Sequence, residues 1–179
     1  MALDALCLAA ALRELNAYVE GGRIDKIYQP GARDIVLGIR GPQGNVRVLL
    51  SANPSHPRIH LTVLERENPD KPPMFCMLLR KHLTGARILN LGQPYMERVV
   101  TVRLEATDEL GDKVSRSLVL EAMGRHANLI LLDGEGRIIE CIHRVEGDIT
   151  TGARQVLPGL FYQMPEPRFG IPPLLEREL

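Results

Sequence analysis

The chain has 179 residues, of which 45% are hydrophobic and 25% charged, and its formal net charge is zero. This composition is ordinary for a globular protein and argues against a disordered chain. The length suits one domain with a substantial core, or one domain and an extension. Aromatic residues make up only 4% and tryptophan is absent, so aliphatic side chains and Met must supply most of the core.

The charge is unevenly distributed along the chain. Residues 1–70 hold eight Lys and Arg against eight Asp and Glu, residues 71–103 six against one, and residues 104–179 eight against thirteen. A basic segment inside a neutral protein can bind a polyanion locally. The alternative is a solvated face whose charges pair with the acidic segment in space.

A helix is expected between Leu3 and Val19, because apolar residues recur there at helical spacing and Gly21-Gly22 follows. In the strand expected next, alternation places Ile24 and Ile27 on opposite faces. Further strands, separated by turn residues, are expected at 34–40, 45–51 and 58–63.

A second helix is expected to open at Pro72-Pro73, because proline suits the first helical turn, and to end at Gly85. Its apolar residues share one face, and Arg80 and Lys81 are expected to point away from that face. Most of the remaining chain reads as strand, at 87–91, 98–106, 115–123, 128–133 and 137–144.

The proline-rich residues 157–173 lack periodicity and predict an extended exit, after which 174–179 read as the start of a helix. We therefore predict one domain over residues 1–165, an exit segment over 166–179, and a natural protein that continues. The order helix, strands, helix, strands predicts the α+β class, as an antiparallel β-sandwich or flattened barrel with flanking helices.

The three cysteines, Cys7, Cys76 and Cys141, form no CxxC pair and sit in apolar surroundings. This pattern predicts buried free thiols in a reducing compartment. No signal peptide is visible and no apolar run is long enough to span a membrane, so a cytoplasmic location without membrane contact is expected.

Motifs for catalysis or cofactor binding are absent from the sequence. It contains no P-loop, no GxGxxG and no GxSxG. His56 and His60 are four residues apart, but Pro54 and Pro57 argue against the helix that a zinc pair at this spacing needs. We therefore expect no metal, no cofactor, no small-molecule substrate and no enzymatic activity.

Polar residues instead gather at the ends of apolar strands, in three short clusters at 52–60, 96–98 and 121–128. Such clusters suit contacts with RNA, because Arg binds phosphate in bidentate fashion, His and Arg stack on bases, and Asn reads base edges. Each residue alone also fits ordinary structure: Asn53 as a turn cap, Gly124 at a bulge, His126 in the core. From the residues alone, both interpretations stay open.

Two sequence blocks resemble the N-terminal domain of the RqcH/NFACT ribosome quality-control factors. Residues 72–83, PPMFCMLLRKHL, are similar to a helix that characterises this domain, and residues 121–128, EAMGRHAN, are similar to its signature motif. Weaker blocks at 52–54, 58–62 and 154–159, together with Tyr162, fall in the expected order. The resemblance covers nearly the whole chain.

The resemblance implies a fold similar to the N-terminal domain of formamidopyrimidine-DNA glycosylases. Those enzymes use an N-terminal proline and an adjacent glutamate, whereas this chain begins Met1-Ala2-Leu3 and lacks that nucleophile. The resemblance further implies a factor that binds large ribosomal subunits obstructed by peptidyl-tRNA. Such a factor recruits tRNA, alanyl-tRNA in bacteria, so that the stalled chain gains a C-terminal tail without mRNA. Members of this family also carry the older name fibronectin-binding protein, so a surface fibronectin-binding adhesin is the alternative.

The resemblance also implies which residues bind tRNA. Glu97-Arg98 aligns with an acid–arginine pair that is usually Asp-Arg, and the block at 121–128 is the second motif, with Ala122 where a larger aliphatic residue is usual. The candidates for tRNA binding are Glu97, Arg98, Glu121, Met123, Arg125, His126 and Asn128. Possible further RNA contacts are Arg58, Arg80 and Lys81.

Overall fold

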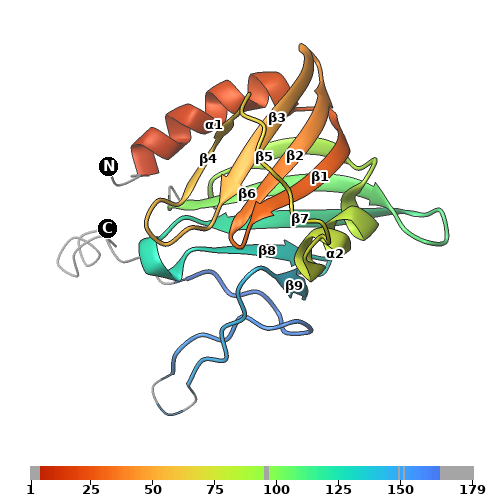
Figure 1. Cartoon of the computed structure of the whole chain (residues 1–179). Helices are drawn as coiled ribbons and strands as arrows, with labels where there is room; N and C mark the ends of the chain where they lie inside the picture. Colours follow the sequence, from red (N-terminus) through yellow and green to blue (C-terminus); the bar gives the residue numbers. More distant parts are fainter. Residues whose placement is uncertain (1–4, 95–96, 149, 151, 166–179) are drawn as a thin grey trace, which may run out of the picture.

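The computed structural model describes residues 5–94, 97–148, 150 and 152–165, which form an α+β fold (Figure 1). Its first half contains α1 (Ala5–Val19), β1 (Arg23–Gly31), β2 (Asp34–Gly41), β3 (Gly44–Ser51), β4 (Arg58–Leu61) and α2 (Met74–Leu83). Its second half contains β5 (Arg87–Gly92), β6 (Val99–Thr107), β7 (Lys113–Glu121), the 3₁₀ turn η2 (Gly124–His126), β8 (Asn128–Leu132) and β9 (Ile138–Cys141). The elements follow the predicted order, with shifts at their ends.

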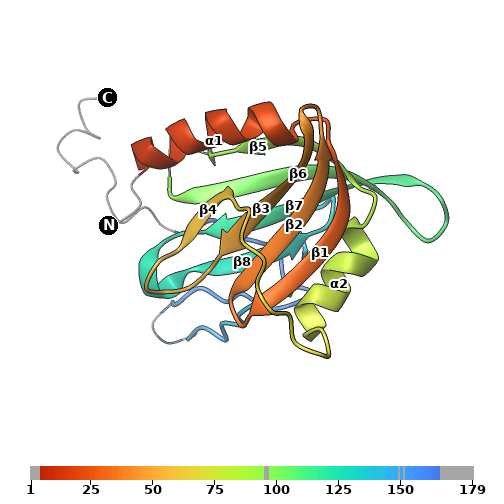
Figure 2. The same cartoon turned by 45° about the horizontal axis from the view of Figure 1, so that its top comes forward.

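The strands form one nine-stranded antiparallel sheet in the order β4-β3-β2-β1-β5-β6-β7-β8-β9. The sheet curves strongly, and β1 meets β5 through one residue pair, Arg23 opposite Arg87. This narrow junction divides the sheet into two halves, β1–β4 and β5–β9, that face each other across the core (Figure 2). The predicted α+β class is confirmed, but the sandwich or flattened barrel is replaced by a single open sheet with β4 and β9 at its edges. The likeness to glycosylases stays a prediction.

Each helix packs against both halves of the sheet. α1 contacts β5 and also β2, β3 and β4, and α2 contacts β1, β6 and β9. The helices contribute Leu8, Leu12, Leu79 and Leu83 to the main core, where all four side chains are buried. Burial of a leucine side chain stabilises the fold by about 1.5–3 kcal/mol. In the described part of the chain, no helix combines the length and apolar character needed to cross a membrane.

The first strand differs from its predicted alternation. Ile24 and Ile27 were expected on opposite faces, yet both are buried in the main core. The pairing with β2 shifts between Ile24 and Lys26, so Asp25 is an extra residue in a bulge. A bulge reverses the faces of all residues after it, and a simple period of two cannot anticipate it.

The segment that follows β9 folds back on β6–β9 over its described residues, with a bridge between Val145 and Val156. The extended exit expected at 157–173 begins in this segment, but Phe161 bridges to Arg137, so this described part of it packs on the domain. The segment covers a second, smaller core that includes Val99, Val119, Ile130 and Cys141. The predicted helix start at 174–179 and the exit segment at 166–179 lie outside the described residues.

The cysteine prediction holds for two of the three thiols. Cys76 and Cys141 are buried, whereas Cys7 is exposed. The helical pattern explains the difference, because Leu8 occupies the buried face of α1 and its neighbour Cys7 then points outward.

Candidate functional site

The two motifs nominated from the sequence meet at one end of the sheet. Val99, the first residue of β6, pairs with Glu121, the last residue of β7. The Ala122 amide donates a hydrogen bond of 2.8 Å to the Arg98 carbonyl. Glu97-Arg98 and the 121–128 block, 23 positions apart in sequence, are therefore neighbours on adjacent strands.

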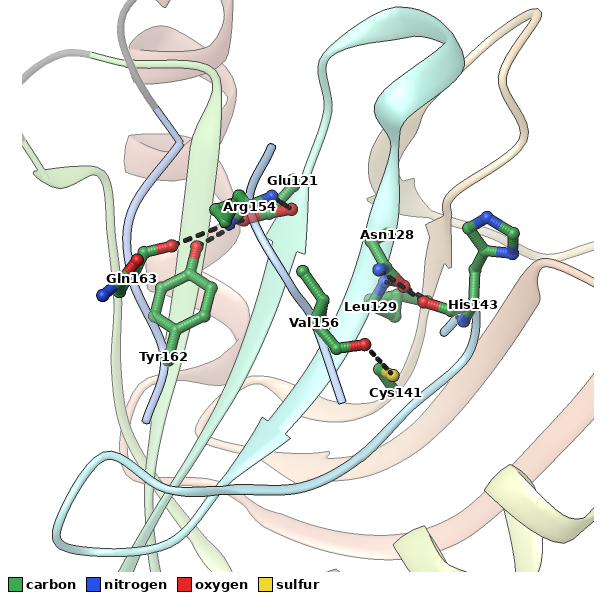
Figure 3. A network of polar contacts seen from close by, with 9 residues as sticks. All are labelled: Glu121, Asn128, Leu129, Cys141, His143, Arg154, Val156, Tyr162 and Gln163. Carbon is green, nitrogen blue, oxygen red and sulfur yellow. Dashed lines mark hydrogen bonds and ion pairs between the residues drawn. The ribbon is translucent and has the colours of Figure 1, made fainter. Parts of the chain in front are cut away.

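Glu121 is fully buried, with a side-chain exposure of 0%. Arg154 donates to both carboxylate oxygens, at 2.7 Å each, and the Tyr162 hydroxyl donates to Oε2 at 2.6 Å (Figure 3). Arg154 also donates to the Gln163 carbonyl at 2.7 Å. Glu121 is thus placed to hold the segment that follows β9 against the end of β7 rather than to touch a ligand. We call this segment, the described residues between 142 and 165, the returning segment.

The protonation states of this cluster follow from its contacts. Burial alone would lower the pKa of Arg154, but the hydrogen bonds and charge of Glu121 outweigh it and raise that pKa. Burial raises the pKa of Tyr162, and the nearby carboxylate raises it further. Arg154 therefore stays charged and Tyr162 stays a neutral phenol at physiological pH.

Asn128, which is also buried, forms a second set of hydrogen bonds to the segment that follows β9. Its amide nitrogen donates to the His143 carbonyl at 2.7 Å, and its amide oxygen accepts from the backbone N–H groups of His143 and Leu129 (Figure 3). Both functional atoms of the amide are therefore engaged. Asn128 thus ties the chain after β9 to the start of β8.

Between Glu121 and Asn128, η2 carries the exposed residues of the 121–128 motif. Gly124 has a φ of +55°, a conformation that glycine adopts at little cost, and it allows the chain to turn sharply at the end of β7. Arg125 and His126 follow and are exposed, while Met123 before the turn is buried. The turn thus separates side chains that build the site from side chains that face solvent.

A pocket of about 680 Å³ lies between η2 and the returning segment. We call it the turn pocket. Met123 and Asn128 line its buried side, Arg125 and His126 line it from η2, and Arg154 lines it from the returning segment. None of the described residues that line it is acidic.

His143 also lines the turn pocket. Its ring Nδ1 lies 3.1 Å from Nη2 of Arg33, a residue of the turn between β1 and β2. Burial lowers the pKa of His143 and the Arg33 charge lowers it further, so the ring is neutral at pH 7 and can accept this hydrogen bond. The contact joins the two halves of the sheet beside the pocket.

None of the three possible further contacts lines the turn pocket, and Lys81 lies far from it. Lys81 pairs with Glu109 at 3.4 Å, in the β6–β7 turn. That turn is at the opposite end of the nine-residue β6 from Val99, roughly 26 Å away at 3.3 Å per residue. Figures 1 and 2 accordingly show α2 and η2 on opposite sides of the molecule.

Arg80 does not point away from the helix's packing face as predicted. Its Nε donates to the Ile27 carbonyl at 2.8 Å, so it helps to dock α2 on β1. Arg58 begins the edge strand β4 and donates to the His56 carbonyl at 3.0 Å. The structure therefore groups the seven tRNA candidates at one end of the sheet, away from Arg80 and Lys81. Arg58 does not line the turn pocket.

Sequence reasoning gave no role to Arg154, Tyr162, His143 or Arg33. One signal was available: Glu121 ends a buried strand, and a buried carboxylate requires a cation or hydrogen-bond donors. The sequence does not indicate which of the many later cations provides that partner. Among the described residues, no group of three or more His, Cys, Asp or Glu side chains could hold a metal ion.

Comparisons with known proteins agree with the motifs. The family model described as NFACT N-terminal and middle domains matches residues 4–179. The chain is 41% identical over 175 residues to the Rqc2 homolog RqcH of Bacillus subtilis, covering 97% of this chain and 30% of that protein. It is 33% identical over 146 residues to the ribosome quality control complex subunit 2 of Saccharomyces cerevisiae, covering 80% of this chain and 13% of that protein.

A solved structure is similar to this chain in both fold and sequence. The crystal structure of the N-terminal domain of fibronectin-binding protein PavA from Streptococcus pneumoniae superposes with a TM-score of 0.87 at 37% identity, covering 98% of this chain and 67% of that one. The curated relatives are much longer, since this chain spans 30% of the Bacillus protein. Because the family model matches nearly every residue, the chain belongs to the NFACT family.

Proposed function

We propose that this chain is the tRNA-binding domain of a ribosome quality-control factor and that the turn pocket is its tRNA contact. The observation that carries the proposal is the lining of that pocket, which combines Arg125 and Arg154 with His126 and His143 and has no acid among its described residues. The names of the relatives, an Rqc2 homolog and a ribosome quality control complex subunit, support the ribosomal role.

The roles of the nominated residues divide according to burial. Arg125 and His126 are exposed on η2, where a guanidinium can bind phosphate and an imidazole can stack on a base. Arg98, half-buried beside the turn, extends the basic surface. Glu121, Met123 and Asn128 are buried, so we assign them to positioning the turn and its neighbouring segment.

The family resemblance supplies the finer part of the proposal. In it, the complete protein binds large ribosomal subunits that carry peptidyl-tRNA and recruits alanyl-tRNA, and the stalled chain is extended without mRNA. The domain acts by binding, and the ribosome forms the peptide bond. Electrostatic contacts as few as those of the turn pocket give weak binding at physiological salt, so other parts of the complete protein contribute to ribosome affinity.

The test is tRNA binding and tailing by the full-length protein that contains this domain, with Arg98→Ala and Arg125→Ala variants. We expect each variant to bind tRNA more weakly at every salt concentration and to reduce the salt slope by about one unit. Arg98→Ala should also abolish tailing. Lys113→Ala is the matched control, because Lys113 is 78% exposed in β7 at the far end of the sheet. Wild-type tRNA binding and tailing in both variants would contradict the proposal.

A second candidate function comes from the structural relative whose title names fibronectin binding. Under this alternative, the same domain binds host fibronectin at the cell surface. Detection of the full-length protein on intact cells, together with fibronectin binding that is unchanged by Arg98→Ala and Arg125→Ala, would favour it. Loss of tRNA binding in those variants without any fibronectin binding would favour the RNA role.

A further inference from the structure

A second hollow lies on the outer face of β1–β4. Two adjoining depressions of about 480 and 420 Å³ share Tyr28, Arg47, Thr62 and Glu65 in their linings. We call their union the outer groove. The link between β4 and α2 runs past these strands in both views (Figures 1 and 2). The outer groove shares no lining residue with the turn pocket.

The strand register shows how the groove is built. Ile35 and Leu37 of β2 belong to the main core, so the alternating residues Val36 and Gly38 face outward. One row across the sheet runs Tyr28, Val36, Leu49, His60. Val36 and Leu49 are buried, although neither belongs to the main core, and they form an apolar floor for the groove.

In the neighbouring cross-strand row, a glycine lies between two cationic residues. Lys26 pairs with Gly38, and Gly38 pairs with Arg47. At about 4.8 Å between strands, the Cα atoms of Lys26 and Arg47 lie roughly 10 Å apart. Gly38 has no side chain, and a Cβ built on it would meet the Lys26 Cβ at 3.4 Å. Lys26, Gly38 and Arg47 all line the groove, so the two cations face a shared space that no Gly38 side chain fills.

The lining of the groove is predominantly basic, with five cations, Lys26, Arg40, Arg47, Arg58 and Arg66, against two carboxylates, Asp25 and Glu65. The carboxylates pair only loosely, at 3.4 Å with Arg40 and 3.4 Å with Arg47, and these ion pairs are exposed. Exposed pairs contribute about 0–1 kcal/mol, so phosphate can replace them. Arg66 is committed to the buried Asp34 at 2.5 Å and ties down the β4–α2 link instead.

The groove also offers planar groups. Tyr28 lines both depressions, and the Arg80 guanidinium lies 5.9 Å from its ring centroid. His60 is in the same cross-strand row and is exposed. Aromatic rings set among cations on a sheet face are the features with which proteins bind single-stranded nucleic acid, because every base has a face that can stack.

We propose that the outer groove binds a single-stranded stretch of RNA, with phosphates at Lys26, Arg47 and Arg58 and a base against Tyr28. The proposal builds on the RNA role proposed above but concerns a separate surface, so a complete protein could hold two RNA elements at once. An acidic protein segment would satisfy the cations but would make no use of the Tyr28 ring. The ring therefore favours RNA.

The test measures binding of a labelled oligouridylate of about eight nucleotides, a length within the usual site size of such surfaces, to the full-length protein. We expect Lys26→Gln with Arg47→Gln to weaken binding at least about tenfold and to reduce the salt slope by about two units. Tyr28→Leu should weaken it about tenfold, whereas Tyr28→Phe, which keeps the ring, should bind like the wild type. Lys113→Gln is the control for a charge lost elsewhere, and thermal unfolding checks that each variant is folded.

The outcomes separate this inference from the proposed function. Arg125→Ala should weaken tRNA binding and leave oligouridylate binding unchanged. If the Lys26 and Arg47 double variant binds oligouridylate within about twofold of the wild type, the groove proposal is overturned whether or not the turn pocket binds tRNA. If polyglutamate competes as well as RNA and Tyr28→Leu changes nothing, the groove is a site for an acidic protein segment and the RNA proposal fails.

Discussion

Arg154 and Glu121, 33 positions apart, form a buried bidentate ion pair with two hydrogen bonds of 2.7 Å. The pair joins the end of β7 to the segment that returns after β9. Tyr162 completes it with a third hydrogen bond to the same carboxylate. Arg154 also lines the turn pocket, so this pair holds one of the pocket's cations in place.

The first prediction concerns loss of one partner. Arg154→Met leaves the Glu121 carboxylate buried with Tyr162 as its remaining side-chain donor, and breaking a buried pair in this way costs about 3–5 kcal/mol. Because the Arg154 side chain is 23% exposed, the lower end of that range is expected. Urea denaturation followed by circular dichroism measures the loss in the free energy of unfolding.

Glu121→Met combined with Arg154→Met is the matched control. Replacing both members of a buried pair by apolar residues removes the uncompensated charge, so the double variant should recover much of the lost stability. A double variant as unstable as Arg154→Met alone would show that the segment is held by other contacts.

The second prediction tests the hydrogen bond from the Tyr162 hydroxyl. Tyr162→Phe keeps the ring that packs on the smaller core and removes the hydrogen bond to Glu121. A hydrogen bond to a charged group contributes about 1.5–3 kcal/mol, so the free energy of unfolding should fall by that amount. Tyr18→Phe, at a position 36% exposed on α1, should change it by less than about 0.5 kcal/mol. Equal losses in the two variants would argue against the contact with Glu121.

Hydrophobic periodicity was sufficient to predict both helices and the order of the strands, because each element buries one regular face. It was insufficient at β1, where the bulge at Asp25 brings Ile24 and Ile27 to the same core. The way in which the strands join into one sheet could not be predicted from the sequence either. Whether two runs of strands form a sandwich or one open sheet depends on the junction of β1 with β5, here the single pair Arg23 and Arg87.

The candidate site was predictable to the extent that it is local in sequence. Arg125 and His126 follow a glycine in one short motif, and the structure exposes both on η2. Glu121 and Asn128 belong to the same motif, but their partners Arg154 and His143 lie 33 and 15 positions away along the chain, outside that motif. Direct contact and positioning could therefore not be distinguished before the fold was known.

The third prediction concerns pH. Burial and the Arg33 charge lower the pKa of His143 from its usual value of about 6.5. Between that value and the lower folded pKa, the unfolded chain binds more protons than the folded one, so stability is full above about pH 6.5 and declines as the pH falls. His82, whose pKa is lowered by burial and by Arg116, contributes in the same direction.

Urea denaturation at pH 7.5 and 5.0 provides the measurement. His143→Gln and His82→Gln should each lose less stability between the two pH values than the wild type does, because each removes one of the two titrating groups. A wild-type pH dependence in both variants would assign the decline to other groups, such as carboxylates.

The fourth prediction concerns the turn. Gly124 has a φ of +55°, so Gly124→Ala should reduce the free energy of unfolding by about 1–2 kcal/mol even though open space surrounds the position. The strained turn would also displace Arg125 and His126, and tRNA binding should weaken. Gly92→Ala is the control, because a Cβ there also meets open space but the backbone is that of a strand. It should not destabilise the protein, and a loss equal to that of Gly124→Ala would contradict the role of backbone conformation.

The last prediction uses a thiol to report on the returning segment. Cys141 is buried in the smaller core, where its Sγ lies 3.6 Å from the Val156 carbonyl, and burial with the Glu140 charge raises its pKa to about 11. At pH 8 roughly one thousandth of such a thiol is thiolate, so iodoacetamide should modify exposed Cys7 first. In a Cys7→Ser background, alkylation of Cys141 should be slow when Arg154 is present and much faster when Arg154→Met is added. Opening of the returning segment exposes the sulfur and restores its ordinary pKa. Cys76, buried between α2 and β1, is the internal reference for global unfolding, and the lower stability of Arg154→Met should speed its alkylation less than that of Cys141. Equal acceleration at both thiols would indicate global unfolding alone, whereas a larger acceleration at Cys141 would show that the Glu121–Arg154 pair holds this segment in place.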